Sequence, residues 1–161
     1  MDGLSSALDS LRRSQLEARI QELNRLILQY RSEINYYNEQ LRVVDQSYES
    51  VSGFKGSVQR SQECFSEVSS AKSSVLEQVN SVSRNNTAAK KYYSGMKRVL
   101  TGTGTKIASK LYSFLLLKIR NEQASLINKS NDYAGKINYF NRMLGNAQSE
   151  LAQKTQELQN L

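Results

Sequence analysis

Few residues in this chain have the types and spacing that catalysis or metal binding requires. The 161 residues include no histidine and a single cysteine, Cys64. A Ser-His-Asp or Cys-His relay needs an imidazole base, and a structural zinc site needs several cysteine or histidine ligands. We therefore expect no enzyme activity, no catalytic residue, no metal site and no cofactor. Cys64 is interpreted as a small residue at the edge of a helix-packing stripe.

A Thr-Gly run has the composition of a phosphate-binding loop. It reads Thr101-Gly102-Thr103-Gly104-Thr105 and is followed by Lys106. A phosphate loop of the P-loop type has the spacing G-x-x-x-x-G-K-[ST] and follows a strand, and neither feature is present. The run is also the strongest helix breaker in the sequence, so it predicts a turn between two helices.

The positive charges gather in one part of the chain. Lys and Arg number 22 against 15 Asp and Glu, a net charge of +7. Between Arg84 and Arg120 there is no acidic residue, and the basic ones are Arg84, Lys90, Lys91, Lys97, Arg98, Lys106, Lys110, Lys118 and Arg120. Such a block is either a solvated face or a binding surface for an acidic protein, a nucleic acid or an anionic lipid.

The same block contains an unusually apolar segment. Its apolar residues are Leu111, Phe114, Leu115, Leu116, Leu117 and Ile119, and Lys110 and Lys118 flank them. A helix that is apolar on nearly all sides needs burial on more than one neighbour. Apolar contacts supply affinity and charges supply orientation at protein interfaces, so we expect these eight residues to bind a protein partner. Tyr92 and Tyr93 could stack on bases, which leaves nucleic acid as a less favoured alternative.

Two long apolar seams, meaning rows of residues spaced alternately by four and three, predict the helices that position this segment. The first contains Leu16, Ile20, Leu23, Ile27, Tyr30, Ile34, Tyr37, Leu41, Val44, Tyr48 and Val51. The second contains Leu126, Tyr133, Ile137, Phe140, Leu144, Ala147, Leu151, Leu158 and Leu161, with the polar residues Ser130 and Lys154 at the two remaining positions. This spacing is typical of helices that pack as coiled coils. We predict helices over about 10–52 and 105–161.

The middle of the chain predicts two further helices. Gly53 and Gly56 interrupt the first seam and favour a bend or break, after which Val58, Phe65, Val68, Val75, Val79 and Val82 form a thinner stripe. We predict a Ser-rich helix over 57–83 and a short basic helix over 88–100, with an N-cap near Asn86. The fold class is therefore all-α. We expect residues 1–161 to form a single domain, an elongated antiparallel helical hairpin or coiled-coil stalk with extra helices in the middle.

The sequence has no segment that resembles a signal peptide or a membrane span. Met1–Ser10 carries Asp2 and Asp9 and lacks an apolar stretch. The most apolar run, Leu111–Leu117, is far shorter than the roughly 20 residues that cross a membrane. We expect a cytoplasmic chain without a transmembrane segment or a cleavable signal peptide.

This layout resembles the LXG-associated small α-helical proteins of type VIIb secretion in Gram-positive bacteria, relatives of the WxG helical-hairpin family. The chain has no Trp, so the aromatic-x-Gly element is represented by Phe54-Lys55-Gly56 or Tyr93-Ser94-Gly95. The acidic Y-x-x-x-[DE] export signal of the wider family is missing, because Ile137 follows Tyr133 and Met143 follows Tyr139 at that spacing.

The resemblance implies a function in protein export. It implies a targeting factor or chaperone that binds the N-terminal helical LXG domain of a secreted toxin, takes no small-molecule substrate, and can be exported together with its partner. It also implies contact with a second small helical protein and with the secretion apparatus. The main alternative is a structural coiled-coil scaffold whose function is self-association, and a nucleic-acid-binding helical protein is the third hypothesis.

Overall fold

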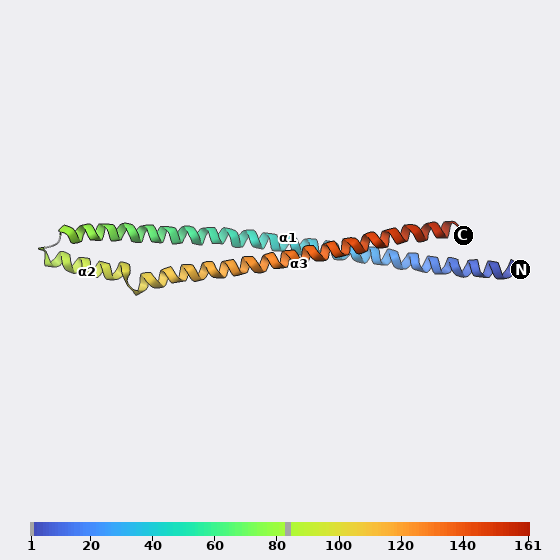
Figure 1. The fold of residues 1–161 in the computed structure, drawn as a ribbon, viewed down its shortest axis with the longest axis horizontal. Helices are drawn as coiled ribbons and strands as arrows, with labels where there is room; N and C mark the ends of the chain where they lie inside the picture. The colour runs from blue at the N-terminus through green and yellow to red at the C-terminus, as the bar shows by residue number, and fades with distance from the viewer. Residues whose placement is uncertain (1, 83–84) are drawn as a thin grey trace. The chain divides into compact units, whose positions relative to one another are not determined.

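Three helices account for almost all of the residues that the structure describes. The computed structural model describes residues 2–82 and 85–161, with side chains from residue 7 onward. Helix α1 spans Asp2–Val82, α2 spans Thr87–Thr101 and α3 spans Thr103–Gln159 (Figure 1). No strand occurs in these two ranges, which confirms the predicted all-α helical hairpin. Ser83, the end of the predicted Ser-rich helix, and Arg84, the first residue of the basic block, lie outside the described residues.

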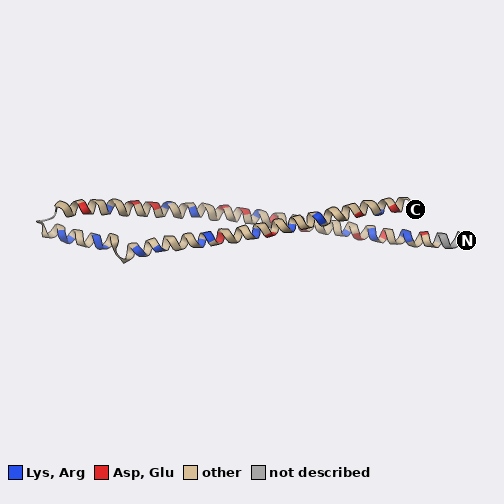
Figure 2. Ribbon diagram, viewed as in Figure 1, with Lys and Arg blue, Asp and Glu red and all other residues tan. Residues whose placement is uncertain are grey.

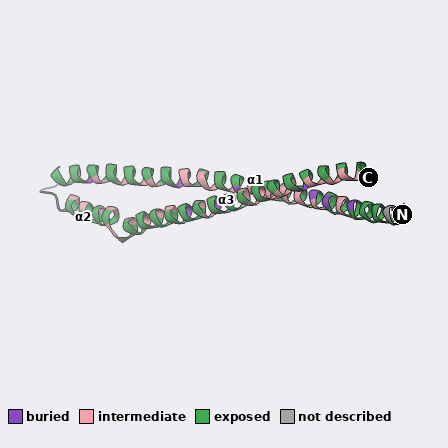
Figure 3. Cartoon of the chain, turned by 45° about the vertical axis from the view of Figure 1, so that its right-hand side comes forward, coloured by how far each residue is buried: buried purple, intermediate pink, exposed green. Residues whose placement is uncertain are grey.

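The helices divide into two compact units. Unit 1 contains Met1–Gln46 and Ile127–Leu161, and unit 2 contains Ser47–Leu126. Each unit is built from one part of α1 and one part of α3, and unit 2 also contains α2. In both units the buried residues occur on the sides of the helices that face each other (Figure 3).

Unit 1 is held together by the two predicted seams. Its core contains Leu23, Ile27 and Ala147, and Tyr30, Leu144 and Leu151 pack against it. Leu23 is only 1% exposed. Tyr30 contacts Phe140 and Tyr37 contacts Tyr133, so seven residues forward along α1 match seven residues back along α3. The helices therefore pair antiparallel, one heptad against one heptad, as coiled-coil packing requires.

An aromatic ladder continues this core. The Tyr37 ring stacks on Phe140 with centroids 5.9 Å apart and an interplanar angle of 14°, and it lies 5.9 Å from Tyr133. Lys136 reaches over both tyrosines, with its Nζ 5.2 Å from the Tyr37 centroid and 5.8 Å from the Tyr133 centroid. Aromatic pairs and cation–π contacts of this kind stabilise a partly solvated interface, where tyrosine hydroxyls keep access to water.

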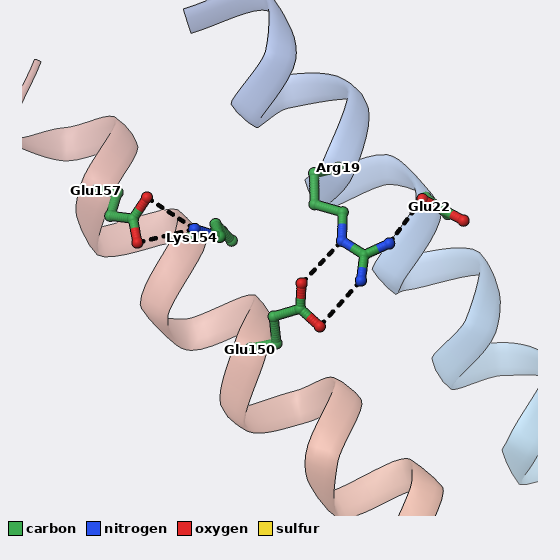
Figure 4. A network of polar contacts seen from close by, with 5 residues as sticks. All are labelled: Arg19, Glu22, Glu150, Lys154 and Glu157. Carbon is green, nitrogen blue, oxygen red and sulfur yellow. Dashed lines mark hydrogen bonds and ion pairs between the residues drawn. The ribbon is translucent and has the colours of Figure 1, made fainter. Parts of the chain in front are cut away.

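One ion pair across the helices fixes the register of unit 1. The Arg19 guanidinium donates to both carboxylate oxygens of Glu150, from Nε to Oε1 at 2.8 Å and from Nη2 to Oε2 at 3.0 Å (Figure 4). Its remaining Nη1 donates to Glu22 at 2.8 Å. A two-point contact between planar groups tolerates little sliding of one helix along the other. These hydrogen bonds hold the pKa of Glu150 below its ordinary value.

The predicted break at Gly53 and Gly56 is wrong, because α1 is helical throughout Asp2–Val82. The inward seam continues with the same spacing through Lys55, Val58, Gln62, Phe65 and Ser69, all buried or half-buried, while Phe54 points outward and is 53% exposed. Two glycines cost a helix about 1 kcal/mol each. With no proline present and Val58 packed into unit 2, that cost does not end the helix.

Polar residues occupy part of the seam in unit 2. Gln123 donates from Nε2 to the Ser52 hydroxyl at 2.9 Å and accepts from Lys55 Nζ at 3.4 Å. Further along α1, Phe65 contacts Tyr112 with centroids 5.9 Å apart. Leu76 is buried, whereas Val68, Val75 and Val82, which were predicted to face inward, are exposed. The polar seam positions explain why the apolar pattern became thinner in this part of the sequence.

The start of α2 and the junction between α2 and α3 lie within a few residues of the positions that were predicted from the sequence. Asn86 is the N-cap of α2, and its side-chain oxygen accepts from the backbone amides of Ala88 and Ala89 at 2.9 and 3.1 Å. The predicted Thr-Gly turn is shorter than expected, because Gly102 alone separates α2 from α3. A Cβ at Gly102 would overlap the Arg98 carbonyl oxygen, so only glycine fits there without a backbone shift.

Two glycine substitutions are expected to change stability in opposite directions. Gly53→Ala should raise the free energy of unfolding by about 0.5–1 kcal/mol, because alanine favours the helix and nothing lies within 4 Å of the added Cβ. Gly102→Ala should lower it, because the added Cβ meets the backbone of Arg98. Urea denaturation followed by circular dichroism measures both. A destabilised Gly53→Ala variant would show that α1 bends at that glycine.

The Arg19–Glu150 pair predicts a pH dependence of stability. The folded-state pKa of Glu150 is depressed, first by the hydrogen bonds from Arg19. The pair therefore contributes stability above the ordinary glutamate pKa of about 4.3, and the contribution is lost as the pH falls through the depressed value. We expect Glu150→Gln to melt at a lower temperature than the wild type at pH 7 and at the same temperature at pH 2. An equal difference at both pH values would contradict this assignment.

Candidate functional site

The structure divides the predicted partner-binding segment into an exposed part and a buried part. Four of its apolar side chains are open to solvent, with Leu111 60%, Phe114 57%, Leu117 54% and Leu115 37% exposed. Ile107 on the same helix is 51% exposed. We call these five residues the α3 patch. Its flanking residues Lys110 and Lys118 are both exposed, as the sequence predicted.

Leu116 and Ile119 do not belong to this surface, which corrects the sequence-based assignment. Ile119 is 5% exposed and is part of the core of unit 2, and Leu116 is half-buried. Both fall in the inward seam with Tyr112, which contacts Phe65 on α1. Each residue of an α-helix is rotated by about 100° from the previous one, so the residues between these three point away from α1. Only one side of the segment packs in the core of unit 2, so the apolar side chains on its other side stay exposed.

The charges around the α3 patch are positive. Lys118 lies over the Phe114 ring with its Nζ 5.5 Å from the centroid, so the charge sits at the edge of the apolar surface. Lysine and arginine are also spread along α2 and the first part of α3, while the facing part of α1 carries both signs (Figure 2). An approaching surface therefore meets an apolar row bordered by cations, which favours an acidic partner over a basic one.

One cation of α2 is already engaged within unit 2. Lys97 Nζ lies 2.9 Å from the Tyr93 hydroxyl and 3.7 Å from Glu77, and Tyr93 donates to Glu77 at 2.7 Å. The contact with Tyr93, followed by the charge of Glu77, raises the pKa of Lys97. Of the two tyrosines considered for base stacking, Tyr93 is thus held by its hydroxyl and Tyr92 is open, at 57% exposed.

Both aromatic-x-Gly elements lie inside helices. Phe54 and Gly56 are within α1, and Tyr93 and Gly95 are within α2. No atom lies within 4 Å of a Cβ added at Gly95, and at Gly56 the only neighbour is the end of the Arg60 side chain at 3.7 Å. Neither glycine is therefore needed for a turn or a close contact in this structure. Phe54 contributes an exposed ring instead.

The sequence analysis missed Ile107 as a member of the exposed row. The signal was present, because Ile107, Leu111 and Phe114 are spaced by four and then three residues. This is the spacing of a helix stripe, and it runs beside the seam rather than within it. A search for two overlapping stripes on one helix, rather than a single stripe, would have found it.

Replacing a side chain of the segment by alanine should change the free energy of unfolding differently at its exposed and at its buried positions. Ile119→Ala is expected to lower the free energy of unfolding by about 2–5 kcal/mol, because it leaves a cavity in the core of unit 2. Leu117→Ala should change it by less than about 0.5 kcal/mol, since its side chain is open to solvent. Urea unfolding of both variants checks this. A cost of several kcal/mol for Leu117→Ala would place that residue in a core.

The described residues contain few other features that bear on function. None of the helices in the described ranges has the length and apolarity that crossing a membrane demands. Within the same ranges, no cluster of three or more Asp, Glu, Cys or His side chains could hold a metal ion. Comparisons of the chain with protein-family models, with curated proteins and with solved structures found no match.

Proposed function

We propose that this chain is a non-enzymatic helical partner that binds the N-terminal helical LXG domain of a secreted toxin and presents it for export by type VII secretion. The observation that carries the proposal is the α3 patch, a row of large apolar side chains that are 37–60% exposed. Contiguous exposed apolar surface of this kind marks protein interaction sites. The resemblance of the layout to LXG-associated proteins supplies the class of partner.

The spacing of the α3 patch suits a helical partner. Ile107, Leu111 and Phe114 repeat by four and three residues, which presents a straight stripe along the helix. A partner helix with the same repeat can pack its side chains between them, as in coiled coils and helix-in-groove complexes. The helical N-terminal domain of an LXG protein would provide such a surface.

Charge adds a preference for partners with acidic flanks. Lys110 and Lys118 border the α3 patch, and no acidic residue occurs from residue 85 to residue 120. Cations at the rim of an interface steer association and select the partner more than they add affinity. We therefore propose a partner helix with an apolar stripe and Asp or Glu beside it, bound in the cytoplasm before export.

The experiment is co-expression with the N-terminal helical domain of an LXG-type toxin, followed by pull-down and light scattering. We expect a stable complex with the wild type. Leu117→Asp should weaken it about tenfold or more, because a buried carboxylate without a partner is costly at an interface. Leu28→Asp is the matched control, since Leu28 is a 67% exposed leucine of α1 in unit 1.

Two results would contradict the proposal. Failure of the two wild-type proteins to form a complex removes the toxin-partner function. Equal loss of binding in Leu117→Asp and Leu28→Asp, with both variants still helical by circular dichroism, removes the α3 patch as the site. Unchanged binding by the Leu117→Asp variant would likewise remove the α3 patch as the binding site.

A further inference from the structure

Unit 2 contains a groove between α1 and α2 that the proposed function does not use. It consists of two adjoining depressions, of about 810 and 330 Å³, which share the lining residues Lys72 and Leu100. Along α1 the lining runs from Ser57 to Val79, a length of about 33 Å at 1.5 Å per residue. We call this depression the α1–α2 groove. Its length equals about six turns of an α-helix.

Large apolar side chains form both walls of the α1–α2 groove. Val68 of α1 and Val99 of α2 line the first depression, and Val75 and Tyr92 line the second. These four side chains are 46–65% exposed. On each helix the two wall residues are one heptad apart, and they run in opposite directions because the helices are antiparallel. The walls therefore repeat with the period of a coiled coil, which a third helix with apolar residues at the same spacing can match.

The floor of the groove is apolar, and α2 is only partly covered there. None of the residues of α2, all of which the structure describes, is buried. Met96 and Leu100 are half-buried at the floor, beside Leu76, which is 6% exposed. Short helices owe most of their stability to the packing of an apolar face. A third helix in the groove would cover Met96, Leu100 and the walls together, and would stabilise α2.

The charges that line the groove are positive. Arg60 lines the first depression and Lys72 lines both, and among the described residues no Asp or Glu lines either one. Glu77, Lys118 and Glu122 belong to unit 2 but line neither depression. A neutral or basic occupant would leave the two cations without a counter-charge, whereas an occupant with carboxylates would pair with them.

We propose that the α1–α2 groove binds an acidic amphipathic helix of another protein, which completes a three-helix bundle with α1 and α2. The apolar stripe of that helix packs between the two walls, and its Asp or Glu residues pair with Arg60 and Lys72. These two cations lie about 18 Å apart along α1 at 1.5 Å per residue. The carboxylates that meet them are therefore about three turns apart on the bound helix.

The groove suits an acidic helix better than other occupants. The phosphate backbone of a nucleic acid offers charge but no apolar side chains, so it would leave Val68, Val75 and Val99 against a strongly polar surface. A second copy of this chain has a net charge of +7 and would bring mostly cations to Arg60 and Lys72. An acidic amphipathic helix supplies both the apolar contacts and the opposite charge.

This inference goes beyond the proposed toxin-partner function and does not depend on it. None of the five residues of the α3 patch lines either depression, so the two surfaces can be separated by mutation. Synthetic helices of defined sequence can also test the groove without any toxin domain.

The test uses the intact chain and two synthetic fluorescent helices. Both have about 24 residues, the length of the groove, and the same leucine stripe, but one has Glu and the other Lys on both flanks of the stripe. Fluorescence anisotropy at about 0.15 M salt measures their affinities. We expect the acidic helix to bind about tenfold more tightly than the basic one. Cys64 lines the groove, so a saturating acidic helix should slow its alkylation by N-ethylmaleimide about tenfold.

Three variants separate the groove from the net charge of the chain and from the α3 patch. Lys72→Glu should weaken binding of the acidic helix about tenfold. Lys129→Glu makes the same change in net charge on an exposed lysine of unit 1, and should keep the affinity within about twofold of the wild type. Leu117→Asp should bind the acidic helix as the wild type does, even where it loses the toxin domain. Circular dichroism checks that all three remain helical.

Several results would overturn the inference. Among them are no binding of the acidic helix, equal binding of the two helices, and equal weakening by Lys72→Glu and Lys129→Glu. If Cys64 stays fully reactive under a saturating acidic helix, that helix binds elsewhere. Slower alkylation at higher protein concentration without any helix would show that a second copy fills the groove instead. A wild type that binds the toxin domain but not the acidic helix would keep the proposed function and remove this inference alone.

Discussion

The packing of one narrow stripe of α1 against one narrow stripe of α3 is the constraint on which the rest of the structure depends. A helix pair can bury only the residues of its facing seams, so large side chains outside the seams stay in contact with water. Leu23, Ile27 and Ala147 form the buried centre of unit 1, and Val58 and Ile119 are buried in unit 2. With so little interior, the composition of the outer surfaces decides what each unit can bind.

The two units use the seam differently. In unit 1 the seam holds the large apolar and aromatic residues, and the two-point contact of Arg19 with Glu150 fixes its register. In unit 2 part of the seam is polar, with Gln123 hydrogen-bonded to both Ser52 and Lys55, while leucines and valines lie outside it. Both units leave large apolar side chains exposed, and unit 2 leaves more of them than unit 1, so unit 2 has more apolar surface that a further helix could cover.

The charges beside the α3 patch decide which partners it suits. The α3 patch is bordered by Lys110 and Lys118, which suits a partner with acidic flanks.

The sequence by itself determined that the chain is helical and which residues form the seams of unit 1, because spacing by four and three residues follows from the helix repeat and is local information. It also located Asn86 and the Thr-Gly turn. It misjudged Gly53, because the cost of a glycine is small beside the packing of Val58 that follows it. Which of Leu115, Leu116, Leu117 and Ile119 face outward was decided only by the tertiary structure, since a helix that is apolar all round has several possible seams and the contact of Tyr112 with Phe65 selects one of them.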